Sequence, residues 1–141
     1  MKIILFTFVL YASFLQAQSK IIVSQSIHDI DKNTLIFSID TSFYDVEIVK
    51  TTDKHVTVET TVTSNTGSKS VLSYLRNQGR YNINVYQHAK FHATIFYLNH
   101  DKKDIYINGS TIHEDYHFII RVPSDMKIKV KKPQDQSIAS S

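Results

Sequence analysis

The feature that most constrains the fold of this chain is a strict two-residue alternation of side chains. In the run 56–62, Val56, Val58, Thr60 and Val62 would lie on one face of an extended segment. Alternation with a period of two is typical of a β-strand that buries one face. Related β-branched runs occupy 34–39, 46–49, 81–86, 94–98, 104–107, 111–122 and 126–131. The sequence therefore predicts an all-β, mainly antiparallel fold, either a sandwich or the start of a β-solenoid-like stack.

Two turn signals connect these runs. The segment 52–54 separates the runs 46–49 and 56–62, and this spacing predicts a hairpin between them. Asn108-Gly109 is the strongest turn signal in the chain, because both residue types tolerate a positive φ. We expect it to close a second hairpin between the runs on either side of it.

One segment follows helical spacing instead. Ser68 precedes it as a possible N-cap and Gly79 follows it, and its apolar stripe consists of Val71, Leu72 and Leu75. A cap, a stripe at this spacing and a terminal glycine predict a short amphipathic α-helix near residues 69–78. The alternative for this segment is an irregular loop.

The amino terminus indicates export. Lys2 is followed by an apolar run from 3 to 15 and by Gln16-Ala17, the pattern of a secretory signal peptide. We expect cleavage after Ala17, with an uncleaved membrane anchor as the alternative, although the run is shorter than the ~20 residues needed to span a bilayer. The predicted division is a signal peptide at 1–17, one β-rich domain at 18–132 and a disordered polar tail at 133–141. The expected location is periplasmic, outer-surface or secreted, without a later membrane segment.

Composition and charge exclude several classes of protein. The chain has no cysteine, which excludes a disulfide scaffold, a cysteine zinc site and a thiol nucleophile. The net charge is +3, but Lys2 lies in the expected signal peptide, so the exported chain would be nearly neutral. This balance and the export signal argue against a nucleic-acid partner. A basic strip formed by Lys127, Lys129, Lys131 and Lys132 with Arg121 is explained by lysines that protect an edge strand from aggregation.

The segment from His113 to His117 is a literal match to the H-E-x-x-H motif of zinc peptidases. That motif works on a helix, where residues four apart are neighbours and both imidazoles reach one ion. Here the segment follows a hairpin turn and enters a β-branched run that ends at Pro123. On a strand, positions four apart are separated by roughly 13 Å, and Glu114 would not share a face with His117. We therefore predict no zinc site at this segment.

Other chemistry has weak support. His88 and His92 are four apart, and they could bind zinc or copper if a loop brought them toward His100, with Asp101 and Asp104 as companions. No strand-to-helix nucleophile turn and no glycine-rich phosphate loop is present in the sequence. The prediction is therefore that the protein has no catalytic residue, no cofactor and no metal, with His88, His92, His113 and His117 as the metal candidates to test.

The order of these elements resembles a known family. Asp45-Val46-Glu47-Ile48-Val49, the strand with Val56 and Val58, the short helix leading to Gly79-Arg80-Tyr81, and the Val122-Pro123 strand end carry the resemblance. They are similar to the opening part of adhesin domains of unknown function in secreted Bacteroidetes-type proteins, including the autotransporter adhesin head-domain group. Family members continue into repeated short strands with glycine turns, so the resemblance implies either a short variant or a truncated member. The family supplies no catalytic residues.

These observations predict an exported, non-enzymatic binding module of the cell envelope or surface. Its partner would be an envelope component, a surface protein or a glycan, contacted by a sheet edge or an exposed aromatic face. The candidate contact residues are Tyr81, Tyr86, Phe96, Tyr97 and Tyr106. The alternatives are a histidine-dependent metal-binding protein or hydrolase, and a β-barrel that carries a small ligand in an apolar cavity.

Overall fold

The structure, a computed structural model, describes residues 18–28, 30, 34–38, 44–97 and 103–131. The expected signal peptide and polar tail lie outside these residues. The described elements in chain order are β1 (Ser19–Ile27), β2 (Thr34–Ser38), β3 (Asp45–Thr51), β4 (Val56–Ser64), α1 (Lys69–Asn77), β5 (Asn84–His88), a 3-10 turn (Ala89–Phe91), β6 (Ala93–Tyr97), β7 (Ile105–Ile107), β8 (Ser110–Ile112), β9 (Glu114–Pro123) and β10 (Lys127–Lys131).

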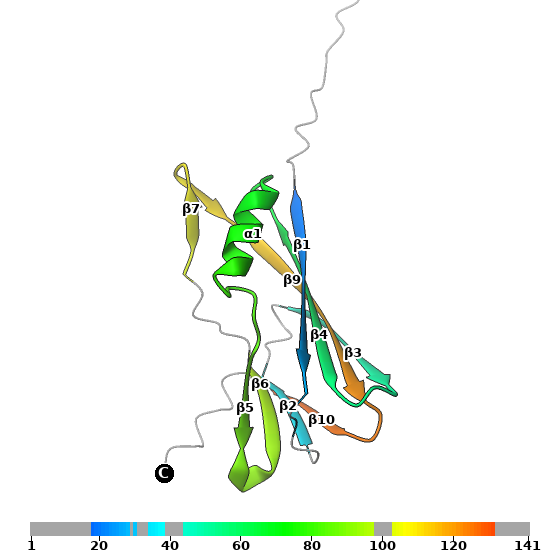
Figure 1. Ribbon diagram of the computed structural model, residues 1–141. Helices are drawn as coiled ribbons and strands as arrows, with labels where there is room; N and C mark the ends of the chain where they lie inside the picture. Colours follow the sequence, from blue (N-terminus) through cyan, green and yellow to red (C-terminus); the bar gives the residue numbers. More distant parts are fainter. Residues whose placement is uncertain (1–17, 29, 31–33, 39–43, 98–102, 132–141) are drawn as a thin grey trace, which may run out of the picture.

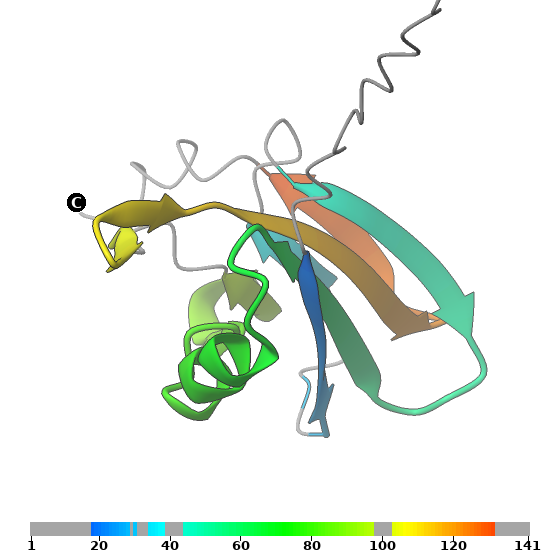
Figure 2. The ribbon, with the colours of Figure 1, turned by 90° about the horizontal axis from the view of Figure 1, so that it is seen from above.

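The strands form two four-stranded sheets and a small hairpin (Figure 1). We call the sheet with order β1-β4-β9-β3 sheet A and the sheet with order β10-β2-β6-β5 sheet B. Among the described strands, β7 pairs with β8 alone. Viewed from above, α1 lies beside β1, and the β7–β8 hairpin lies beyond the start of β9 on the same side as the helix (Figure 2). This confirms the predicted β-rich fold with one short helix.

Both sheets contribute to one apolar core. The alternating residues Val56, Val58 and Val62 of β4 are buried, as the period of two predicted, and Thr60 is buried with them. From sheet B, Phe37 and Phe96 occupy register positions on parallel neighbouring strands, and their rings stack with centroids 4.7 Å apart. Burying large aromatic and aliphatic side chains from two sheets supplies the main stabilisation of such a fold.

The prediction of a hairpin between the runs 46–49 and 56–62, which lie in β3 and β4, is wrong. β9 lies between β3 and β4, parallel to β3 and antiparallel to β4. β3 therefore pairs with a strand that lies far along the chain. Asp45 is opposite His117, and Thr51 is opposite Pro123. β9 is buried among apolar neighbours on one face along most of its length, and two flanking strands satisfy its backbone groups on both sides.

The helix ends in a complete Schellman motif. Gly79 adopts a left-handed conformation with φ +76°, its N–H bonds to the Arg76 carbonyl, and the Arg80 N–H bonds to the Leu75 carbonyl. Ser68 has the extended backbone of an N-cap, but its hydroxyl bonds to Ser70 Oγ and not to the helix backbone. The glycine therefore directs the chain that follows the helix, and this direction positions Arg80.

Asn108 and Gly109 form the predicted two-residue hairpin turn, with φ values of 50° and 77°. The hairpin joins β7 to β8, and the chain leaves the ladder at His113 before β9 begins. The expected run 111–122 is therefore two strands. Neither sheet closes on itself among the described strands, because each order ends in two different edge strands. The small-ligand β-barrel alternative is wrong for this reason.

Candidate functional site

The H-E-x-x-H segment begins β9 at the end of sheet A that lies beside α1 (Figure 1). His113 is exposed, and its backbone N–H bonds to Asn65 Oδ1 at 2.9 Å. Glu114 and Tyr116 face the interior, whereas His117 faces the outer side. The extended backbone keeps the two histidines apart, as predicted for a strand.

Glu114 is the centre of a buried polar cluster. Its carboxylate accepts hydrogen bonds from Arg80 Nη2 at 2.7 Å and Nε at 3.0 Å, from the Tyr81 hydroxyl at 2.7 Å and from the Tyr116 hydroxyl at 3.1 Å. Arg80 also donates to the Lys103 carbonyl at 3.1 Å. The side chains of Arg80 and Glu114 are only 17% and 6% exposed. We call these four residues, Arg80, Tyr81, Glu114 and Tyr116, the Glu114 cluster.

The electrostatics of the cluster keep Glu114 ionised. Burial alone would raise the pKa of Glu114, but hydrogen bonds from Arg80 and Tyr81 and the charge of Arg80 hold this pKa below its ordinary value. Burial, together with the adjacent carboxylate, raises the pKa values of Tyr81 and Tyr116. A carboxylate with every oxygen engaged by donors is a poor proton acceptor. The cluster joins the segment between α1 and β5, which contains Arg80 and Tyr81, to β9. It does not resemble a reactive site.

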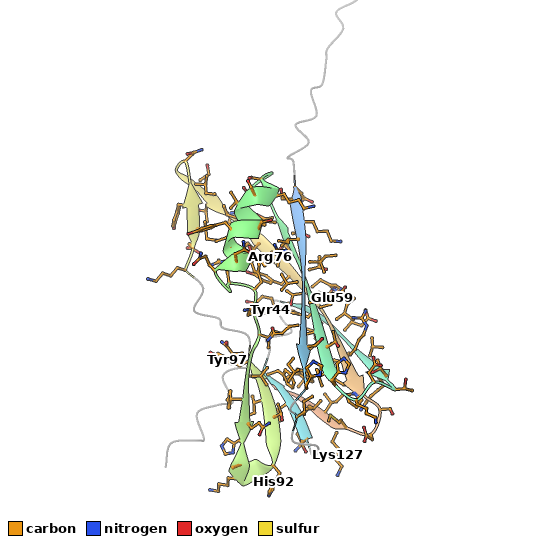
Figure 3. All side chains as sticks on the ribbon, viewed as in Figure 1. Tyr44, Glu59, Arg76, His92, Tyr97 and Lys127 are labelled. Carbon is orange, nitrogen blue, oxygen red and sulfur yellow. The ribbon has the colours of Figure 1, made fainter. Side chains whose placement is uncertain are left out.

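The remaining histidines of the sequence prediction lie in separate places. His117 Nδ1 contacts Asp45 Oδ2 at 2.7 Å on the outer face of sheet A, where β3 and β9 are parallel neighbours. His88 ends β5, and His92 follows the 3-10 turn in a left-handed conformation at the tip of the β5–β6 hairpin (Figure 3). His100 and Asp101 lie outside the described residues. Among the residues that the structure describes, no three metal-ligating side chains come together.

The aromatic candidates divide between core and surface. Tyr81 and Phe96 are 1% and 0% exposed, so the prediction that they contact a partner is wrong. Tyr97 is half-buried at the end of β6 (Figure 3). Tyr86 and Tyr106 are exposed, on an edge strand and on the β7–β8 hairpin.

The basic strip is also divided. β10 is an edge strand of sheet B, where Lys127 and Lys129 are exposed, which fits edge protection. Arg121 belongs to sheet A, and its guanidinium lies 3.6 Å from the Glu59 carboxylate. Lys132 lies outside the described residues. Lys127 and Lys129 therefore belong to a different sheet from Arg121.

An apolar groove that the sequence did not indicate lies between α1 and β7. It has a volume of about 340 Å³ and is lined by Ser70, Val71, Tyr74, Leu75, Ile105 and Ile107. Figures 1 and 2 both show the helix and the β7–β8 hairpin side by side. Tyr74 is 63% exposed, although it lines this groove. The helix thus buries Leu72 in the core and presents Val71, Tyr74 and Leu75 toward the hairpin.

Basic side chains occur on the elements that form the groove, although none of them lines it. Lys69 and Arg76 are exposed on α1, and Lys103 is exposed just before β7, next to the exposed Asp104. No acidic residue occurs between Asn65 and Arg80, so α1 carries only positive charge. Figure 3 shows Arg76 on the lower part of α1.

His28 and His55 form a pair that the sequence did not indicate, with ring centroids 5.0 Å apart. The pairing of β1 with β4 brings them together, and β1 was not among the predicted strands. Only the pairing of β1 with β4 could have revealed this contact. His28 and His55 are far apart in the sequence and belong to no recognised motif.

The comparisons with known proteins identify no relative. No family model, no curated protein and no solved structure matches the chain. None of the helices that the structure describes is both long and apolar enough to cross a membrane.

Proposed function

We propose that this chain is an exported, non-enzymatic, adhesin-like binding module of the cell envelope or surface, and that it holds its partner in the groove between α1 and β7. The observation that carries the proposal is an exposed apolar groove on a protein whose core is otherwise formed by the two sheets. Contiguous exposed apolar surface marks interaction sites in proteins.

The chemistry of the groove selects an acidic polypeptide segment with apolar anchor side chains. Val71, Leu75, Ile105 and Ile107 offer aliphatic walls, and Tyr74 offers an aromatic side chain with little conformational freedom to lose. Lys69 and Arg76 make α1 a positively charged helix, and a carboxylate-bearing segment would complement this charge. A second copy of this chain is a poorer fit, because the exported chain would be nearly neutral and not acidic.

Two further features support binding over catalysis. The polar groups of the Glu114 cluster hydrogen-bond to one another, so the cluster stabilises the fold and leaves no free group for a substrate. The groove, in contrast, is lined by side chains that do not act as acids, bases or nucleophiles in ordinary enzyme chemistry, apart from Ser70 and Tyr74. The secretory pattern at 1–17 and the resemblance to adhesin domains support the envelope location.

A random peptide library displayed on phage tests the proposal against the purified chain. We expect the selected peptides to share one or two large apolar residues flanked by Asp or Glu. Val71→Glu on the helix and Ile107→Glu on the hairpin should each weaken binding at least tenfold. Tyr86→Glu on the exposed β5 edge is the matched control and should leave binding unchanged.

The opposite pattern would overturn the proposal. Peptides that lose affinity for the Tyr86→Glu variant but not for the two groove variants would place the contact on the edge of sheet B. A consensus without acidic residues would contradict the argument from charge. Circular dichroism of each variant shows whether a loss of binding reflects unfolding.

A further inference from the structure

His28 and His55 lie at the open end of the β1–β4 ladder. The last register pair is Ile27 opposite Val56, so His28 follows that pair on one strand and His55 precedes it on the other. Their ring planes are inclined by 37° and their centroids are 5.0 Å apart. His28 is exposed and His55 is half-buried, so solvent reaches the pair.

Two imidazoles in this relationship can bind one metal ion. Directly opposed residues on antiparallel strands have Cβ atoms about 4.5–5.5 Å apart, with both side chains on the same face. Zinc–imidazole bonds are about 2.0–2.1 Å long, so two nitrogens on one tetrahedral ion lie about 3.3 Å apart. From centroids 5.0 Å apart, rotation of the two rings about their side-chain bonds would bring one nitrogen of each toward that separation.

We propose that His28 and His55 form a two-histidine site for a divalent transition-metal ion, Cu²⁺ or Zn²⁺, with water completing the coordination. Imidazole nitrogen suits both ions, and for a given nitrogen site Cu²⁺ binds more tightly than Zn²⁺. The turn before His55 contains Asp53 and Lys54, whose opposite charges offset each other near the site. The site is separate from the groove and does not depend on the proposed function.

Metal bound here would tie β1 to the rest of sheet A. Within the part of the chain that the structure describes, β1 is an edge strand with β4 as its one neighbour, and the histidine pair lies at one end of that ladder. An ion that binds the folded chain and not the unfolded chain raises the free energy of unfolding by mass action. Saturating Cu²⁺ should therefore raise the melting temperature of the wild-type chain.

Isothermal titration of the purified chain with CuCl₂ and with ZnCl₂, in a buffer that does not bind metal, tests the site. We expect one ion per chain, with Cu²⁺ tighter than Zn²⁺, and at least a tenfold loss of affinity in His28→Ala and in His55→Ala. His92→Ala and His113→Ala are matched controls, and both should bind like the wild type. Electron paramagnetic resonance of the Cu²⁺ form should show two coordinating nitrogens, and one in His55→Ala.

Three results would overturn the inference. Affinity unchanged in His28→Ala and His55→Ala would assign the metal to other histidines. Affinity lost in His92→Ala or His113→Ala would favour the sites first suggested by sequence spacing. No binding up to millimolar Cu²⁺ would show that the two rings only pack against each other. Because His28, His92 and His113 are exposed and His55 is half-buried, thermal unfolding without metal should be similar for all four variants.

Discussion

The side chain of Gln25 pairs with the backbone of Ile83 as another strand would. Gln25 Nε2 donates to the Ile83 carbonyl at 2.9 Å, and the Ile83 N–H donates to Gln25 Oε1 at 3.0 Å. The segment between α1 and β5 thereby gains two hydrogen bonds to β1 without joining a ladder. Ile83 is 2% exposed, so water cannot easily replace these bonds.

Replacing Gln25 with alanine should therefore destabilise the fold. The Ile83 N–H and carbonyl would lose their partners in a buried position, at a cost of about 1–3 kcal/mol. Urea denaturation measures this loss, and Ser24→Ala, on the exposed face of the same strand, is the control. A Gln25→Ala variant as stable as the control would show that water satisfies the Ile83 backbone.

A substitution in the Glu114 cluster should cost more stability than Gln25→Ala. Glu114→Ala leaves the Arg80 guanidinium buried without its counter-ion, and breaking a buried pair in this way costs about 3–5 kcal/mol. Asp115→Ala, the next residue and exposed, should change stability by less than about 0.5 kcal/mol. Equal stability of the two variants in urea denaturation would contradict the role of the cluster.

The same cluster predicts a dependence of stability on acid. The pKa of Glu114 is lower in the folded chain than its ordinary value of 4.5, so its ionisation stabilises the fold above that pH. This contribution is lost as the pH falls below 4.5 through the folded-state pKa. The stability difference between wild type and Glu114→Gln should therefore be largest near pH 7 and shrink toward pH 3. A difference that stays constant over this range would contradict the ionised carboxylate.

Replacing Gly79 should strain the backbone and lower the stability of the fold without causing a steric clash. A Cβ at this position would meet its nearest atom, Asn82 Nδ2, at 3.5 Å, which is ordinary contact. The cost of Gly79→Ala therefore comes from the left-handed φ of +76° and should be about 1 kcal/mol. Gly79→Asn should lose less, because asparagine tolerates this conformation. Thermal unfolding of both variants checks the order, and a larger loss for asparagine would contradict it.

The export prediction can be tested chemically. Expression of the full chain in a bacterium with a secretory pathway should give a protein whose amino terminus, read by mass spectrometry, is Gln18. Ala17→Arg should block this cleavage, because the site requires a small residue before the cut. A wild-type chain that keeps Met1 would contradict the signal peptide.

The local features of this fold could be predicted, whereas its long-range pairings could not. The alternation from Val56 to Val62, the glycine after α1 and the Asn108-Gly109 turn depend on neighbouring residues, and the structure confirms them. The position of β9 between β3 and β4 depends on partners far apart in sequence, which no local pattern encodes.

The candidate sites follow the same division. The strand geometry that separates His113 from His117 could be predicted from the flanking residues. The burial of Glu114 could not, because its main partner Arg80 precedes it by 34 positions. The groove needed the β7–β8 hairpin to lie beside α1, and the histidine pair needed β1, whose serines and glutamine gave no clear strand signal.

Nuclear magnetic resonance titration of the chain with a selected acidic peptide tests the central claim most directly. We expect the largest shifts at Val71, Tyr74, Ile105 and Ile107, which line the groove between α1 and β7. Shifts gathered instead on β5 or β10, the two edges of sheet B, or shifts spread evenly over the surface, would contradict it.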